Sequence, residues 1–169
     1  ALAGFMELFD GTVIQTALPA MSRDLGVSAT TASIAMAAYF AAAAGVIPIC
    51  AWLTDRVGAR TAFTSAIAVF ILASIGCGSA SDLSWLVGAR IIQGIGGAVM
   101  MTVGQIVILR DAPKDKLLNI TAYLVWPALA APVIAPVIGG LITEYAGWRW
   151  LFWINIPLGV MAVVASLRL

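Results

Sequence analysis

Histidine is absent from the sequence, and cysteine occurs only twice, as Cys50 and Cys77. Without histidine, the chain can build neither a Ser-His or Cys-His catalytic pair nor a histidine metal site. It also lacks the phosphate-binding pattern G-x-x-x-x-G-K-[ST], which disfavours ATP-driven activity within the chain. Both cysteines lie inside apolar runs, where a free thiol behaves as a small apolar residue. We therefore expect no enzymatic activity, no metal site and no cofactor.

Charge is scarce as well. Charged residues make up 10% of the chain and hydrophobic residues 62%, whereas globular domains carry roughly 25% charged residues. A membrane-spanning helix needs about 20 mainly apolar residues. Five gaps between charges have about this length, and a further apolar run opens the chain. The predicted fold is therefore an all-α integral membrane protein with spans near 1–21, 31–54, 61–81, 83–109, 117–143 and 149–168. A net charge of +1 without any basic run predicts no nucleic-acid partner.

The start of the chain does not look like a secretory signal peptide. No basic residue precedes the first apolar run, which itself contains Glu7 and Asp10. The sequence begins without methionine and stops as the sixth span ends. We expect the chain to be part of a longer protein.

Lysine and arginine are distributed unevenly over the predicted loops, and cytoplasmic loops collect them. Six fall on one side, namely Arg56, Arg60, Arg110, Lys114, Lys116 and Arg168. Only Arg23 and Arg149 fall on the other. This bias predicts a cytoplasmic N-terminus. Ser28 or Thr30 can cap the second span, Asp82 can cap the fourth, and Gly58 can close the turn after the second.

One stretch of the sequence recurs. “LTDRVGAR” at 53–60 is similar to “ITEYAGWR” at 142–149, with Gly58 matching Gly147 and Arg60 matching Arg149. The offset of 89 residues equals three spans, so the two copies would face opposite sides of the membrane. Inverted repeats of this kind build many secondary transporters. We interpret the chain as two inverted three-helix repeats, 1–81 and 82–169.

Five motifs lie in order on successive parts of the chain. They are “FDGTVIQTALP” at 9–19, “AWLTDRVGAR” at 51–60, “LVGARIIQGIGGA” at 86–98, “APVIAPVIGG” at 131–140 and “WRWLFWINIPLG” at 148–159. Together they resemble the N-terminal six-helix half of the major facilitator superfamily, and most closely its fourteen-helix drug:proton antiporters. Gln15 replaces a usual Asn, and Ala131 and Ala135 replace two glycines of the family pattern.

The resemblance implies a function and partners. It implies a proton-coupled exporter of drugs or other amphipathic small molecules in the bacterial cytoplasmic membrane, working by alternating access with a C-terminal half that this chain lacks. Its partners would be protons, the substrate, that second half and lipid. Two alternatives stay open: a specific metabolite carrier of the same fold, and a half-length membrane protein that does not transport.

The resemblance also assigns roles to two loop and helix motifs. Asp55, Arg56, Gly58 and Arg60 would form a latch that holds the two halves together at the cytoplasmic face. The alternative is that these basic residues only set topology. In the fifth span, the two prolines and two glycines would act as a hinge, unless they reflect the ordinary frequency of proline in membrane helices. These residues are Pro132, Pro136, Gly139 and Gly140.

Candidate substrate-cavity residues come from several spans. They are Gln15, Tyr39, Gln93, Asn119, Tyr123 and Trp126. The spans that carry them supply cavity walls in the family. Packing against neighbouring helices is the alternative for each aromatic residue.

Three ionisable residues lie within spans, where charge is expensive and indicates function. Arg90 lies roughly 12 Å into the fourth span, counted from Asp82, with Gln93 one turn further on the same face. Because histidine is absent, Glu7 and Asp10 are the candidate proton carriers, and their spacing puts them on one helix face. By depth alone, Arg90 lies level with Gln15, so we expect it to act on Asp10 at long reach or through Gln93, not in a tight ion pair. Arg90 could also be a structural anchor only, and Glu7 an interfacial residue.

Overall fold

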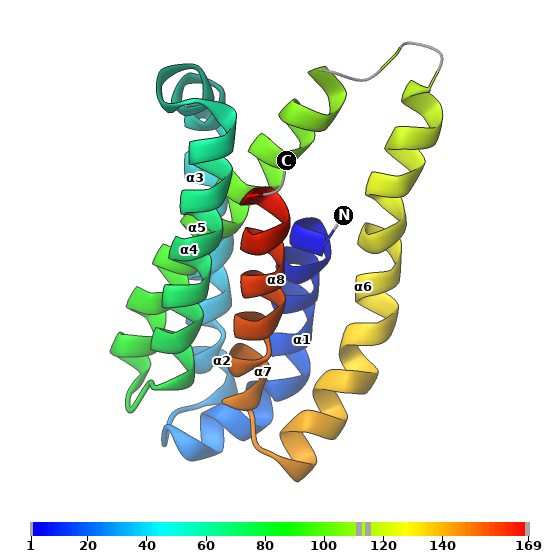
Figure 1. The fold of residues 1–169 in the computed structure, drawn as a ribbon. Helices are drawn as coiled ribbons and strands as arrows, with labels where there is room; N and C mark the ends of the chain where they lie inside the picture. Colours follow the sequence, from blue (N-terminus) through cyan, green and yellow to red (C-terminus); the bar gives the residue numbers. More distant parts are fainter. Residues whose placement is uncertain (1, 111–112, 114–115, 168–169) are drawn as a thin grey trace.

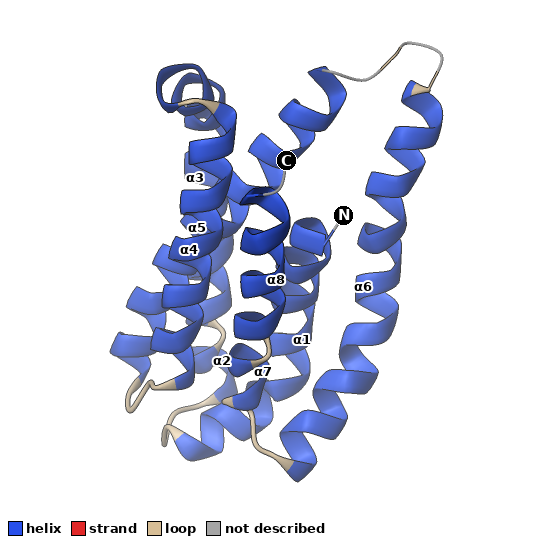
Figure 2. Ribbon diagram, in the orientation of Figure 1, coloured by secondary structure: helices blue, strands red, loops and turns tan. Residues whose placement is uncertain are grey.

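In the described part of the chain, six helical segments run along the long axis of the bundle, and two of them are interrupted by a bend (Figure 1). The computed structural model describes residues 2–110, 113 and 116–167, and within them the only regular secondary structure is helical (Figure 2). The helices are α1 (Leu2–Asp24), α2 (Ala29–Ala32), α3 (Ile34–Val57), α4 (Ala59–Gly78), α5 (Leu83–Arg110), α6 (Leu117–Tyr145), α7 (Trp150–Trp153) and α8 (Asn155–Leu167). With α2–α3 and α7–α8 each taken as one segment, each of the six predicted spans coincides with a helical segment, and the ends agree within a few residues.

The predicted helix ends are also confirmed. Ser28 caps α2 by accepting a hydrogen bond from the Thr31 N–H at 3.1 Å. Asp82 accepts from the Trp85 N–H at 2.9 Å, just before α5. Gly58 follows α3 and its N–H donates to the Thr54 carbonyl. Its φ of +83° is a backbone conformation that only glycine adopts without strain. Gly147, its counterpart in the recurring stretch, has a φ of +92° after α6.

Three segments are long and apolar enough to cross a membrane on their own account. They are 29–57, 59–78 and 83–109, and shorter apolar helices cover 129–145 and 150–166. Many large apolar side chains on these helices are exposed, among them Leu72 and Val133. Such extensive exposed apolar surface is characteristic of contact with lipid. The chain is an integral membrane protein.

The packing places α1 and α5 at the centre of the bundle. α3 and α4 both pack against α5, α4 also packs against α8, and α6 packs along α1 (Figure 1). One apolar cluster surrounds α1, where Val13 and Phe152 are buried. A second lies between α4 and α5, around Ile67 and Met100. The turn between α3 and α4 and the loop between α6 and α7 lie at opposite ends of the bundle.

Candidate functional site

A group of buried polar side chains lies in the middle of this apolar bundle. Its members come from four helices and are at most 1% exposed: Asp10, Ser74, Arg90, Gln93 and Asn155. Polar groups withdrawn from water are stable only when they are hydrogen-bonded. We refer to these five residues as the polar cluster.

The centre of the polar cluster is an ion pair between α1 and α5. The Nη1 atom of Arg90 donates to Asp10 Oδ2 at 2.5 Å and to Gln93 Oε1 at 2.7 Å. The guanidinium also lies over the Tyr39 ring, with its central carbon 4.1 Å from the ring centroid. One acidic neighbour, Asp10, and one aromatic neighbour, Tyr39, therefore compensate the charge of a guanidinium that is shielded from water.

The expectation that Arg90 and Asp10 form no tight ion pair is thus wrong, whereas the expected connection through Gln93 is present beside the direct contact. That expectation compared the levels of two Cα atoms on upright helices. It left out the length of the arginine side chain and the tilt that membrane helices commonly have, about 20° on average. A long guanidinium side chain bridges the difference in level, and the pair is direct.

The second Asp10 oxygen is held by amides. Gln93 Nε2 donates to Asp10 Oδ1 at 3.0 Å and to Ser74 Oγ at 2.8 Å. Asn155 Nδ2 donates to the same Asp10 oxygen at 2.8 Å. Sequence reasoning did not identify Ser74 or Asn155. Both are uncharged, and nothing in an isolated apolar run distinguishes a polar residue that meets a carboxylate from one that bonds its own helix.

Glycines in α5 allow the neighbouring helices to approach the ion pair. A Cβ atom on Gly94 would overlap the backbone carbonyl of Tyr39, and one on Gly96 would lie 2.9 Å from the backbone nitrogen of Phe70. Small residues permit such close helix packing in membranes. The “QGIGG” stretch therefore brings α3 and α4 against α5 and places Tyr39 beside Arg90.

Glu7 lies one turn from Asp10 but outside the polar cluster. It is half-buried. A Cβ atom on Gly97 would lie 3.2 Å from Glu7 Cγ and 3.1 Å from the Tyr39 hydroxyl oxygen, so both side chains converge on this glycine. Glu7 and Asp10 therefore lie on the side of α1 that faces Tyr39 and α5, in agreement with the shared helix face predicted for them.

The expected cavity residues fall into two groups. Tyr39 and Gln93 are buried against the ion pair. Gln15, Asn119 and Trp126 are exposed on α1 and α6, and Trp126 is 71% exposed. The side chain of Tyr123 lies outside the described residues. The structure therefore does not bring the five residues with described side chains together into one enclosed site.

The candidate latch residues lie around the turn between α3 and α4. Asp55 and Arg56 are exposed in the last turn of α3, and the Arg56 guanidinium lies 5.3 Å from the centroid of the Trp52 ring. Arg60 is exposed in the first turn of α4. The tight Gly58 turn keeps these charges together at one end of the bundle.

The candidate hinge in α6 has two distinct faces. Gly139 is buried against α1, where an added Cβ would overlap a Val13 methyl group and lie 2.7 Å from the Thr16 hydroxyl. Ala135 and Ala131 are fully buried, one and two turns away from Gly139 along the same face. Pro132 and Pro136 are exposed, while Gly140 is half-buried and has open space at its Cβ position. α6 remains one continuous helix through both prolines.

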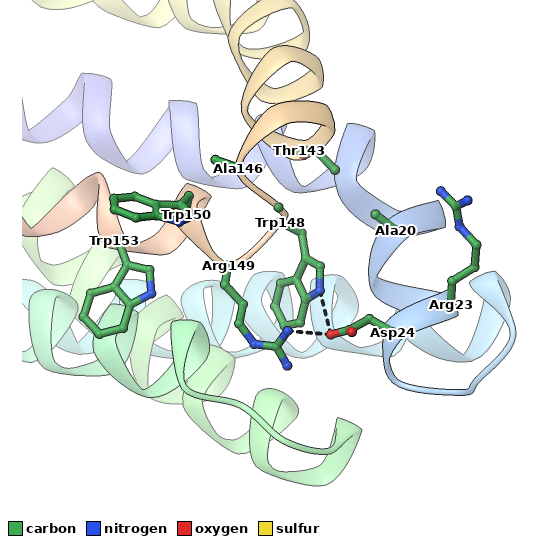
Figure 3. A pocket seen from close by; sticks show the side chains of 10 residues that line it. Ala20, Arg23, Asp24, Thr143, Ala146, Trp148, Arg149, Trp150 and Trp153 are labelled. Carbon is green, nitrogen blue, oxygen red and sulfur yellow. Dashed lines mark hydrogen bonds and ion pairs between the residues drawn. The ribbon is translucent and has the colours of Figure 1, made fainter.

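A second Asp–Arg pair closes the opposite end of the bundle, beside a hollow of about 630 Å³ (Figure 3). Asp24 Oδ2 accepts from Arg149 Nη1 at 2.5 Å and from the Trp148 indole at 3.1 Å. Arg149 Nη2 also donates to the Ala80 carbonyl, so the end of α1 is joined to the α4–α5 and α6–α7 loops. Hydrogen bonds from Arg149, and then from Trp148, lower the pKa of Asp24 below its usual value of 3.8. Arg149 is part of the loop charge count and of the recurring stretch, but the sequence does not predict this pair.

Comparison with known proteins covers the whole chain. The family model of the Major Facilitator Superfamily matches residues 1–169. The chain is 39% identical over 169 residues to the putative multidrug resistance protein MdtD of Cronobacter sakazakii, and 43% identical over 166 residues to the probable transport protein HsrA of Haemophilus influenzae. These alignments cover 100% and 98% of the chain but 36% of each relative. The chain therefore spans about a third of the length of the curated relatives that it matches.

Proposed function

The chain belongs to the Major Facilitator Superfamily, and we propose that it is the N-terminal six-helix half of a proton-coupled efflux transporter for drugs or other amphipathic small molecules. Members of this family are transporters and not enzymes, in agreement with the expectation from the sequence. The names of the relatives, a multidrug resistance protein and a transport protein, support export of such molecules.

The single observation that carries the proposal is the buried ion pair between Asp10 and Arg90. An ion pair inside a bilayer is expensive to maintain, and ionisable residues there mark ion and proton pathways. Protonation of Asp10 neutralises the carboxylate and removes its electrostatic attraction to Arg90. Because histidine is absent, a carboxylate is the group in this chain that is suited to carry a proton through the membrane. Asp10 is therefore the primary proton carrier, with Glu7 as the secondary candidate and Arg90 as the counter-charge.

The architecture of the proposed transporter follows from the recurring stretch. Residues 1–81 and 82–169 form two inverted three-helix repeats, and a C-terminal half completes the substrate pathway. The positive φ of both Gly58 and Gly147, at opposite ends of the bundle, supports this division. Alternating access then consists of a rocking of this half against the other.

Specific segments serve that movement. The end of the bundle that carries Asp55, Arg56, Gly58 and Arg60 is cytoplasmic, together with the N-terminus, and these residues form the latch to the second half. The face of α6 that carries Pro132 and Pro136 provides the hinge, since Gly139 keeps the opposite face packed on α1. The exposed Gln15, Asn119 and Trp126 contribute to the substrate cavity between the halves. The buried Tyr39 and Gln93 contribute from the interior of this half, and Tyr123 contributes from the same helix as Trp126.

Drug-induced proton release from the intact, detergent-solubilised protein tests the proposal. Asp10→Asn should abolish the release, because the carrier can no longer bind a proton, and Glu7→Gln should reduce it. Asp24→Asn is the matched control: the same substitution on the same helix, at an exposed end. Intact proton release and efflux in the double variant Asp10→Asn, Glu7→Gln would place the proton site elsewhere and contradict the proposal.

A further inference from the structure

Asn155 occupies the junction of the two parts of the sixth segment. α7 ends at Trp153 and α8 begins at Asn155, whose side chain is fully buried. Its Nδ2 atom donates to Asp10 Oδ1 at 2.8 Å and lies 3.4 Å from Ser74 Oγ. Asn155 therefore connects α8 to the carboxylate of α1 and to the hydroxyl of α4.

The two side-chain amides of the polar cluster, Gln93 and Asn155, differ in how many of their polar atoms have hydrogen-bond partners. The Gln93 amide is occupied at both ends: Oε1 accepts from Arg90 Nη1 and Cys77 Sγ, and Nε2 donates to Asp10 and Ser74. The Asn155 amide is occupied at one end only. Among the described residues, its Oδ1 atom is buried and has no donor. A buried acceptor without a donor is unfavourable. The other buried polar atoms around Asp10 that lack a partner in the described part of the chain, Arg90 Nε, Arg90 Nη2 and the Tyr39 hydroxyl, all carry a hydrogen to donate, so Asn155 Oδ1 is the pure acceptor among them.

Protonation of Asp10 creates a need for such an acceptor. As a carboxylate, Asp10 only accepts hydrogen bonds, and Arg90, Gln93 and Asn155 all donate to it. As a carboxylic acid, it gains one O–H that must donate. The neighbouring Gln93 Oε1 already accepts two hydrogen bonds, whereas Asn155 Oδ1 belongs to an amide that can present either its NH₂ or its carbonyl.

We propose that Asn155 is a positioning residue that follows the protonation state of Asp10. Its NH₂ donates to the carboxylate when Asp10 is charged. When a proton binds to Asp10 Oδ1, the amide turns about its terminal torsion and its carbonyl accepts the new O–H. Because Asn155 begins α8, this exchange couples the protonation of α1 to the bend between α7 and α8. The inference rests on the proposed function and deepens it.

Other ionisable side chains surround Asp10, and none of them is substituted in the Asn155 variants tested below. They are Glu7 on the same helix, Tyr39 on α3, Cys77 on α4 and Arg90 on α5. From α8, the described polar contact to Asp10 comes from the uncharged Asn155. A substitution at Asn155 therefore changes one hydrogen bond to Asp10 without removing a charge.

The same two helices carry a matched control. Thr64 of α4 and Ser166 of α8 have hydroxyl oxygens 3.2 Å apart, about three helical turns from Ser74 and Asn155 along each helix. This pair joins α4 to α8 as Asn155 and Ser74 do, but far from Asp10. Ser166→Ala thus removes a polar contact between these helices and leaves the polar cluster intact.

The test is the pH dependence of drug-induced proton release in the intact protein. Asn155→Leu keeps the branching at Cγ and loses both the donor and the acceptor. A hydrogen bond to a charged carboxylate is roughly twice as strong as one to a neutral group, so the charged form loses more. We expect the midpoint of proton release to move to higher pH by about one unit, a tenfold change in proton affinity. Asn155→Thr supplies a hydroxyl that can donate and accept, so it should move the midpoint less. Ser166→Ala should not move the midpoint.

Infrared difference spectroscopy provides the second readout. The carbonyl band of protonated Asp10, assigned by its loss in Asp10→Asn, should shift to higher wavenumber in Asn155→Leu because its O–H loses the acceptor. An unchanged midpoint and an unchanged band in Asn155→Leu, or in Asn155→Thr if the leucine variant does not fold, would overturn the role of Asn155 alone. Proton release that survives Asp10→Asn would instead overturn the proposed function, and this inference with it.

Discussion

Two Asp–Arg pairs in this molecule have the same geometry and opposite surroundings. Asp10 and Arg90 meet at 2.5 Å with side chains 1% and 0% exposed, and Asp24 and Arg149 meet at 2.5 Å with side chains 45% and 39% exposed. Distance alone therefore says little about what an ion pair does. A buried pair is strongly coupled to its protonation state, since either partner left alone is an uncompensated charge. An exposed pair is weakened by water and salt and serves mainly to position loops.

Removing the buried arginine should have the largest effect. Arg90→Leu leaves Asp10 buried without its cation, and we expect a loss of about 3–5 kcal/mol of stability, measured as thermal unfolding in detergent. The double variant Asp10→Asn, Arg90→Leu removes both charges and should recover much of that stability while proton release stays absent. Equal melting temperatures for the single and double variants would mean that Asp10 is not charged in the resting protein.

An intermediate effect is expected where α6 packs on α1, the helix that carries both aspartates. Gly139→Leu introduces a side chain into the space of Val13 and Thr16, and overpacking of this kind is unfavourable by about 1–3 kcal/mol. Gly140→Leu is the neighbouring control, because a Cβ at Gly140 meets open space. Thermal unfolding should separate the two variants. Equal stability would show that α6 does not pack tightly on α1 in the membrane.

The exposed pair should give the smallest effect. Asp24→Asn should lower stability by less than about 1 kcal/mol, and molar salt should reduce the difference further. Because hydrogen bonds lower the pKa of Asp24 in the folded protein, its contribution is present above the usual value of 3.8 and is lost as pH falls through the lowered value. Melting curves of the wild type and Asp24→Asn should therefore converge on acidification. A difference that persists at low pH and high salt would assign Asp24 a role beyond its charge.

The two pairs also differ in how far they can be predicted from the sequence. Asp10 and Arg90 were recognised because a charge within an apolar run is conspicuous, and their presence indicates function by itself. Their direct contact was not predicted, since it depends on side-chain length and helix tilt. Asp24 and Arg149 lie at the ends of runs, where charges are ordinary, and 125 residues separate them. Nothing local in the sequence connects them.

The sequence by itself determined the number of helical segments, their approximate ends and the family. These follow from properties of neighbouring residues: runs long enough to cross a bilayer, the caps Ser28 and Asp82, and a glycine at position 58 that alone adopts the left-handed turn without strain. The tertiary structure decided which polar groups meet. Ser74 and Asn155 reach Asp10 only because α4, α5 and α8 pack around α1, and the glycines after Arg90 set how closely they do so. Hydrogen-bond partners far apart in the chain are selected by packing, and packing is a property of all the helices together.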